Sequence, residues 1–154
     1  NSTRAALIEV IAPRLSGRAA IEELRVEHLD RSRFRLFGYH TCGRRDSETA
    51  VAERLFDRFV QGPLLVSEWV DTIADDAPHA LIYPELGMDG PTLQLAGLPL
   101  APVQCTSWGQ PTTSGLPTMD YYLSSALMEP PDGVEHYTER LVQLPGLGTA
   151  LPLM

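Results

Sequence analysis

The chain has 154 residues and a mass of 16.9 kDa, which suits one compact domain and is too small for two of ordinary size. Apolar residues make up 44% of it and charged residues 21%, so disordered, collagen-like and coiled-coil proteins are excluded. No apolar run approaches the roughly 18 residues that cross a bilayer, so no membrane-spanning helix is expected. Because residues 1–4 include neither an initiator Met nor a signal sequence, we expect a fragment of a longer protein.

The basic residues are all Arg. The net charge of −8 comes from 20 acidic and 12 basic residues, and the chain contains no Lys. A Walker-type phosphate loop, a Schiff-base lysine and a lysine general base are therefore excluded. Eleven of the Arg lie in residues 1–60, whereas residues 61–154 hold only Arg140 against eleven acidic residues. Because phosphate neutralisation needs a basic surface, we expect no nucleic-acid partner.

Two cysteines, Cys42 and Cys105, are too few for a disulfide framework and do not have the spacing of a metal site. A reducing, cytoplasmic location is therefore expected. Cys105 lies in an apolar stretch and is best explained as a small core residue.

The first predicted elements are helical. Apolar residues recur at helical spacing over residues 5–15, which predicts a leading helix that Pro13 interrupts, within a leading segment of residues 1–18. A second amphipathic helix is predicted over residues 19–29. The main domain is expected to span residues 19–154.

Short apolar strands then alternate with helices. Strands are predicted over residues 34–39, 80–83, 103–106, 119–123 and 141–144. Helices are predicted over residues 47–59, with an N-cap at Asp46, over residues 65–74, from Pro91 onward and over residues 133–139. This alternation implies right-handed crossovers and a mostly parallel sheet with helices on both faces. The predicted fold class is therefore a doubly wound, Rossmann-like α/β domain.

In such a sheet, ligands bind beyond the carboxyl ends of the strands. The loop that follows the strand over residues 103–106 is rich in Gly and hydroxyl groups: Gly109, Gln110, Pro111, Thr112, Thr113, Ser114 and Gly115. Gly lets backbone N–H groups approach a ligand, and Ser and Thr hydroxyls bind phosphate or sugar oxygens without any Lys. An ordinary turn of small residues explains the same pattern.

Histidine and carboxylate side chains lie near other strand ends. His40 follows a strand, as a site residue should, although a capped surface His fits equally well. His79 has the chemistry of a general base, but it precedes its strand, where a structural role is more common. Glu85 and Asp89 follow that strand, where they either orient a ligand or solvate a turn. Their spacing is not diagnostic of a metal site.

The longest specific motif is residues 100–123, LAPVQCTSWGQPTTSGLPTMDYYL. It resembles the signature block of the O-linked N-acetylglucosamine transferase (SPINDLY-like) glycosyltransferases. The similarity continues upstream through residues 29–34 and 79–89 and downstream through residues 129–145, so that it covers about residues 25–148.

The resemblance implies the N-terminal half of a GT-B catalytic region, in which two Rossmann-like halves face a cleft. Members of the family transfer a sugar from a UDP donor to Ser or Thr hydroxyls of proteins and need no metal. The implied partners are therefore UDP-N-acetylglucosamine or a related UDP-sugar, and a protein acceptor. The parent chain is expected to carry tetratricopeptide repeats and a C-terminal half that holds the donor-binding Lys, and this fragment alone is expected to be inactive.

The same resemblance implies site residues. His79 matches an active-site histidine proposed as a base, and Gly109 and Pro111 match the loop beside the donor sugar. Gln110 stands where relatives have His or Tyr, and the family's first strand is not recognisable in residues 1–24. A different class of function stays open, namely a non-catalytic module that binds a nucleotide-sugar or a protein partner. An unrelated nucleotide-binding α/β domain is the third alternative.

Overall fold

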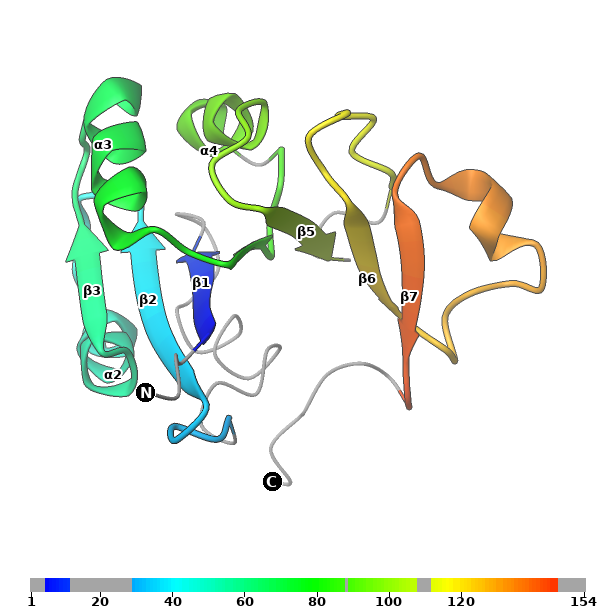
Figure 1. Ribbon diagram of the computed structural model, residues 1–154, viewed down its shortest axis with the longest axis horizontal. Coiled ribbons are helices and arrows are strands. Elements are labelled where there is room, and N and C mark those ends of the chain that lie inside the picture. Colours follow the sequence, from blue (N-terminus) through cyan, green and yellow to red (C-terminus); the bar gives the residue numbers. More distant parts are fainter. Residues whose placement is uncertain (1–4, 12–28, 88, 108–111, 147–154) are drawn as a thin grey trace.

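A computed structural model of the chain describes residues 5–11, 29–87, 89–107 and 112–146. In these residues seven strands form one sheet in the order β3-β2-β1-β4-β5-β6-β7, and every pairing is parallel (Figure 1). The strands are β1 (Ala5–Ile11), β2 (Phe34–His40), β3 (Arg58–Gln61), β4 (Ala80–Tyr83), β5 (Val103–Ser107), β6 (Tyr121–Ser125) and β7 (Arg140–Leu144). Because this order contains that of a Rossmann sheet, the predicted fold class is confirmed.

The N-terminal strand corrects the sequence-based prediction. Residues 5–15 are predicted to form a helix, but Ala5–Ile11 form β1, which lies between β2 and β4. A strand inside a parallel sheet consists of a continuous apolar run, and a run this short also fits helical spacing. The first strand that the resemblance required is therefore present in residues 1–24. The proposed boundary after residue 18 and the predicted helix over 19–29, apart from Leu29, lie outside the described residues.

Three helices connect the described strands: α2 (Ser47–Leu55), α3 (Val66–Asp76) and α4 (Gly90–Ala96). The predicted cap of α2 is confirmed, because Asp46 accepts a hydrogen bond from the Thr49 backbone N–H over 2.9 Å. This helix ends at Leu55, earlier than predicted, and Phe59 belongs to β3 instead. No helix in the described part of the chain is long and apolar enough to cross a membrane.

The chain leaves α2 because Asp57 bonds to β2. The backbone N–H of Asp57 donates to the Leu36 carbonyl over 2.8 Å, and a carboxylate oxygen of Asp57 accepts from the Leu36 N–H over 2.7 Å. These two bonds align the start of β3 with β2. The helical spacing of apolar residues continues past Leu55 because Phe56 and Phe59 pack in the same cluster as the helix.

Helices cover both faces of the sheet, as predicted. One core cluster joins β2 and β4 to α3 and α4, and its largest buried members are Phe37, Tyr39, Trp69, Ile73, Tyr83 and Leu95. A second cluster joins Leu36 of β2 to Ala52 and Phe56 at α2. Successive residues of a strand point to opposite faces, so Phe37 belongs to the first cluster and Leu36 to the second. Consequently α3 and α4 cover one face, where they lie side by side, and α2 covers the other (Figure 1).

The last predicted helix is reduced to a single 3-10 turn. Residues 133–139 are predicted to be helical, but only η2 (Gly133–His136) is, and Glu139 lies in the bend before β7. The predicted start of α4 is confirmed: Pro91 lies in its first turn, and Asp89 caps it by accepting from the Thr92 N–H over 2.6 Å.

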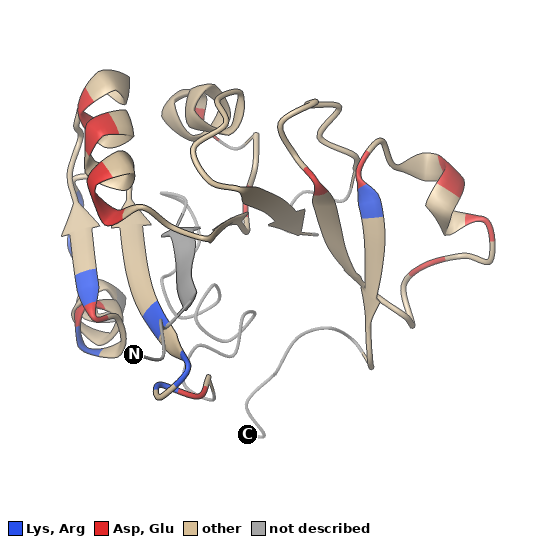
Figure 2. Cartoon of the chain, in the orientation of Figure 1, with Lys and Arg blue, Asp and Glu red and all other residues tan. Residues whose placement is uncertain are grey.

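Charged side chains are distributed unevenly in space (Figure 2). Acidic residues line α3, whereas the described Arg residues lie mainly on and around β2, α2 and β3. Three of these Arg form ion pairs: Arg31 with Asp57 at 3.0 Å, Arg45 with Glu53, and Arg58 with Asp76. The described Arg residues among the first 60 thus lie on one part of the molecule, beside the acidic helix.

Candidate active site at the carboxyl edge of the sheet

The strand order reverses direction between β1 and β4. From β1 the chain proceeds outward to β2 and β3, and from β4 it proceeds the other way to β5, β6 and β7. Ligands of open α/β sheets bind beyond the carboxyl ends of the strands at this reversal. In the described residues, the side chains at these carboxyl ends begin with His40 of β2, Gln61 of β3, Tyr83 of β4 and Ser107 of β5.

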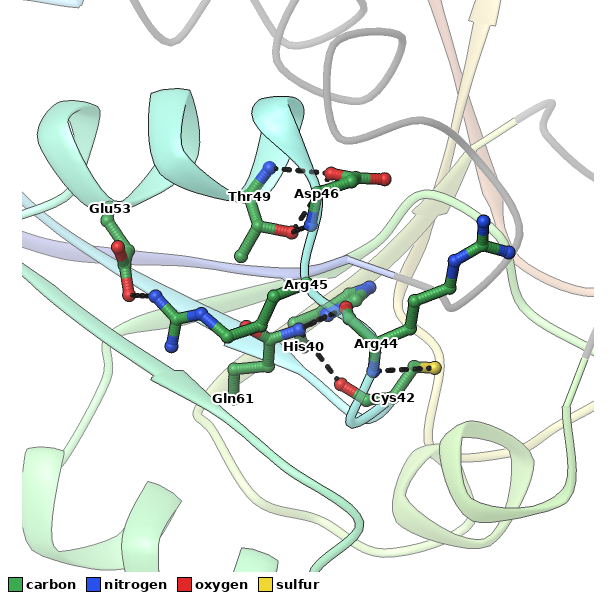
Figure 3. A network of polar contacts seen from close by, with 8 residues as sticks. All are labelled: His40, Cys42, Arg44, Arg45, Asp46, Thr49, Glu53 and Gln61. Atoms are coloured by element: carbon green, nitrogen blue, oxygen red, sulfur yellow. Dashed lines mark hydrogen bonds and ion pairs between the residues drawn. The ribbon is translucent and has the colours of Figure 1, made fainter.

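The most connected group at this edge is His40, the last residue of β2, which is only 9% exposed. Gln61, the last residue of β3, lies beside it in register. The Gln61 amide nitrogen is 2.9 Å from His40 Nδ1 and also donates to the carbonyl oxygens of Cys42, at 3.1 Å, and Arg44, at 2.6 Å (Figure 3). One amide group therefore fixes both the imidazole ring and the loop that follows β2.

The imidazole of His40 is neutral near pH 7. Burial lowers its pKa below the ordinary value, against the opposing effects of the Asp46 charge, a contact with the Cys42 backbone and the Asp89 charge. A neutral imidazole carries a proton on one ring nitrogen and a lone pair on the other. The ring thus offers one donor and one acceptor at the carboxyl edge.

Asp89 connects two parts of the same edge. Besides capping α4, its Oδ2 accepts hydrogen bonds from the Thr41 hydroxyl, over 3.1 Å, and from the Thr92 hydroxyl, over 2.8 Å. Thr41 follows β2, so this carboxylate holds the loop after β2 against the start of α4. Asp89 therefore caps a helix and does not merely solvate a turn, and its predicted role in orienting a ligand stays a prediction.

The turn after β4 is held from β5. The hydroxyl of Thr106 donates to the Tyr83 carbonyl over 3.1 Å, and that of Ser107 donates to the Pro84 carbonyl over 3.3 Å. Glu85 in this turn is 5% exposed, so the predicted role in solvating the turn is wrong. Its buried position at the reversal leaves the role in orienting a ligand as a prediction.

His79 lies at the other edge of the sheet. It precedes β4 directly, and its side chain is exposed. In a parallel sheet the amino ends of the strands lie opposite the carboxyl ends, so His79 is not brought together with His40 and Asp89. The role of His79 as a base stays a prediction from the family resemblance.

The hydroxyl-rich loop is only partly described, because Gly109, Gln110 and Pro111 lie outside the described residues. The next residues bind Glu139. Its carboxylate accepts from the Ser114 backbone N–H over 2.8 Å, from the Ser114 hydroxyl, and from the Thr113 hydroxyl over 2.7 Å. Thr112 is exposed.

Hydrogen bonds from the loop keep the carboxylate of Glu139 ionised, and this carboxylate in turn holds the loop. Burial of Glu139, which is 5% exposed, disfavours its charge, but the hydrogen bonds from Ser114 and Thr113 outweigh burial and lower its pKa. Gly115 adopts a φ of +67°, which suits Gly and strains other residues. The Thr113 and Ser114 hydroxyls, predicted to bind phosphate or sugar, are thus already bonded to a carboxylate, and their binding of substrate stays a prediction.

Solved structures include a close match to this arrangement. A mutant O-GlcNAc transferase of Thermobaculum terrenum superposes on 93% of the chain with a TM-score of 0.82 and 27% sequence identity. Curated sequences called "Probable UDP-N-acetylglucosamine--peptide N-acetylglucosaminyltransferase SPINDLY" match a 45-residue segment, with 51% identity in Arabidopsis thaliana and 49% in Oryza sativa subsp. japonica. In fold and in part of its sequence, the chain is similar to the O-GlcNAc transferase and SPINDLY glycosyltransferases. No family profile matches it.

The chain corresponds to a small part of its O-GlcNAc transferase relatives. The matched segment is 29% of this chain and 5% of each SPINDLY protein, and the chain covers 28% of the T. terrenum enzyme. The α/β sheet is thus the Rossmann-like half of a GT-B fold, as the resemblance implied. In the described part of this SPINDLY relative, no three His, Cys, Asp or Glu side chains form a group that would hold a metal ion.

Two residues of the candidate site were not recognised in the sequence. Gln61 ends a strand of four residues whose first two were predicted as the end of a helix, and Glu139 was placed at the end of a helix. Both act on residues more than 20 positions away, His40 and Ser114 respectively. No local sequence signal marks Gln61, a half-buried residue whose role depends on its position at the end of a strand. Cys105 is confirmed as a core residue, because its side chain is buried in β5. Burial and the Asp120 charge raise its thiol pKa to about 11.

Proposed function

We propose that the chain is the N-terminal half of the catalytic region of a protein O-glycosyltransferase, which transfers N-acetylglucosamine from a UDP donor to Ser or Thr hydroxyls. The observation that carries the proposal is the superposition on the T. terrenum O-GlcNAc transferase over 93% of the chain at 27% identity. The names of the SPINDLY relatives support UDP-N-acetylglucosamine as donor and a peptide as acceptor. The second Rossmann-like half, which completes the cleft, and the tetratricopeptide repeats belong to the proposal.

The proposed reaction makes two demands on the cleft. The acceptor oxygen forms a bond to C1 of the sugar while the bond from C1 to the diphosphate oxygen breaks, and UDP leaves with the electron pair. A base must take the hydroxyl proton, and cationic or N–H groups must stabilise the leaving diphosphate. Because this half has no Lys, its own cations are Arg, and the proposed Lys belongs to the other half.

The proposal assigns the base to His79, from the family resemblance. Its exposed position before β4 is unusual for a catalytic group in an open α/β sheet. This observation favours a second candidate function, a non-catalytic module that binds a nucleotide-sugar or a protein. The two candidates differ in whether the full-length protein transfers sugar at all and in whether transfer needs His79.

Transfer to a Ser-containing peptide by the full-length protein, followed by mass spectrometry, separates the candidates. The proposal expects a peptide heavier by one N-acetylhexosamine, and a loss of at least about 100-fold in kcat for His79→Ala. His136→Ala is the matched control, because His136 is also exposed and lies on η2. Full activity of His79→Ala removes the base assignment. Binding of UDP-N-acetylglucosamine without transfer, in the wild-type protein, supports the non-catalytic module.

A further inference from the structure

The amide of Gln61 reveals which nitrogen of His40 carries the proton. The 2.9 Å between Gln61 Nε2 and His40 Nδ1 is a hydrogen-bond distance, so one nitrogen donates and the other accepts. An amide nitrogen only donates. His40 Nδ1 is therefore the acceptor, provided that the amide has the orientation shown in Figure 3.

Two backbone carbonyls fix that orientation. Gln61 Nε2 is 2.6 Å from the Arg44 carbonyl oxygen and 3.1 Å from the Cys42 carbonyl oxygen. If the amide were rotated by 180°, its oxygen would face both carbonyl oxygens at these distances, and three acceptors would repel one another. The observed orientation prevails although it leaves Gln61 Oε1 buried without a partner in the described residues. The two carbonyl oxygens therefore favour the orientation that directs the amide N–H groups at them, even though Oε1 is left without a partner among the described residues.

The other ring nitrogen of His40 carries the proton and is bonded to none of the described residues. In the neutral ring, a lone pair on Nδ1 requires the proton to be on Nε2. Nε2 has no hydrogen-bond partner among the described residues, and it is not one of their buried polar atoms that lack a partner. His40 stands at the carboxyl end of β2, the strand next to β1 on one side of the reversal, so this donor lies at the edge where ligands of such sheets bind.

We propose that His40 binds substrate as a fixed hydrogen-bond donor, with its Nε2–H directed at an uncharged oxygen, a sugar hydroxyl or a peptide carbonyl. This inference rests on the proposed function, because that function supplies a substrate for the carboxyl edge. His40 is a binding residue and not the base, since its only lone pair is occupied by Gln61. The carboxylates of Asp46 and Asp89 act electrostatically on the ring, which makes a phosphate oxygen the poorer ligand.

The chain offers a matched pair of substitutions for the test. His40→Asn keeps an oxygen near the position of Nδ1, where it still accepts from Gln61, but has no donor at the position of Nε2. His40→Gln reaches the position of Nε2 with an amide N–H and restores the donor. In the full-length protein, His40→Asn is expected to raise one KM about tenfold with kcat little changed, and His40→Gln to recover most of the loss. His136→Asn is the control.

The KM values for the two substrates show which of them supplies the oxygen that His40 binds. A raised KM for UDP-N-acetylglucosamine assigns the ligand to the sugar, and a raised KM for the peptide assigns it to the acceptor. Unchanged values of both KM in His40→Asn, with an unchanged melting temperature, overturn the inference while transfer by the wild-type protein upholds the proposed function. Equal losses in His40→Asn and His40→Gln also overturn it, because the donor is then not what matters.

A second measurement does not need activity. In protein labelled with ¹⁵N-histidine, the ring-nitrogen shifts of His40 are expected to show a protonated Nε2, and Nε2 is expected to move when donor or peptide is added. A protonated Nδ1 overturns the inference. If the wild-type protein transfers no sugar, the proposed function fails, and an Nε2 signal that neither ligand shifts overturns the inference as well.

Discussion

The carboxylate of Glu139 accepts a hydrogen bond from the backbone N–H of Ser114 over 2.8 Å, although the two residues are 25 positions apart. The same carboxylate binds the Thr113 and Ser114 hydroxyls. It thereby attaches the connection between β5 and β6 to the residue that precedes β7. The described end of this loop, at Thr113 and Ser114, is thus held in place by one buried acidic side chain.

Replacing Glu139 by Gln is expected to destabilise the protein by about 2 kcal/mol. Gln keeps the shape, but it loses the charge that strengthens the bonds from three donors, and its NH₂ group faces donors instead of acceptors. Urea unfolding followed by circular dichroism measures the change. Glu135→Gln is the control, because Glu135 is exposed on η2. An equal, small effect of both substitutions contradicts the assigned role.

The stabilisation by Glu139 is expected to disappear in acid. Its pKa is lower in the folded than in the unfolded protein, so the unfolded state takes up the proton first as the pH falls. The contribution is complete above the ordinary pKa of about 4.5 and is lost as the pH falls through the folded value. Unfolding free energies of wild type and Glu139→Gln should therefore differ at pH 7 and converge toward pH 3. A constant difference over this range contradicts the prediction.

The lowered pKa of His40 gives a second pH dependence at milder acidity. The unfolded state protonates near the ordinary value of 6.5, while the folded state resists protonation until a lower pH. Stability is therefore expected to fall as the pH drops below about 6.5. Melting temperatures of wild type and His40→Gln, measured from pH 8 to pH 5, should show a steeper decline for the wild type. Parallel curves would mean that burial of His40 does not affect its protonation.

A polar triad joins β2, β3 and α3. The carboxylate of Asp76, whose side chain is 7% exposed, accepts from the Tyr39 hydroxyl and pairs with Arg58. Tyr39→Phe removes one donor from this buried carboxylate and is expected to cost about 2 kcal/mol in thermal or urea unfolding. Asp71→Asn, on the exposed side of the same helix, should change stability by less than about 0.5 kcal/mol. If Asp76→Asn and Tyr39→Phe are additive in a double-mutant cycle, the pair does not interact.

A glycine in β2 permits close approach of aromatic rings. A Cβ on Gly38 would lie 2.7 Å from Phe59 Cδ2 and 3.0 Å from Phe56, which is closer than carbon atoms tolerate. Gly38→Ala is therefore expected to destabilise the protein by about 1–3 kcal/mol. The matched control is Gly90→Ala in α4, where the nearest atom is 4.0 Å away and Ala is the better helix former. Measured by urea unfolding, the control should be neutral or slightly stabilising.

The strands that Pro residues delimit were predicted well from the sequence. The apolar run of β4 ends at Pro84, and Pro102 precedes β5, so their bounds were correct within a residue. β3 was missed because a strand of four residues follows α2 so closely that its Phe59 continues the helical spacing. β1 was taken as a helix because its position inside the sheet, which favours an apolar run interrupted here only by Glu9, is not visible in local spacing.

The candidate site was predicted only where strand ends define it. His40 was placed at the carboxyl edge because the strand before it was recognised, and the structure agrees. Its partner Gln61 and the loop anchor Glu139 were not found, because hydrogen bonds between residues 21 and 25 positions apart leave no trace in local sequence patterns. The position of Asp89 two residues before Pro91 was a usable sign of a helix cap.

Among the described strands, the first to be synthesised lies inside the sheet and not at its edge. β1 pairs with β2 and also with β4, so that Leu7 lies opposite both Leu36 and Ala80. Until β4 has been synthesised, one edge of β1 has no partner strand, and an unpaired apolar edge is prone to aggregation. Parallel sheets with such distant pairings also form slowly. From the emergence of β1 until that of β4, this edge of the nascent chain is therefore open to pairing with other chains.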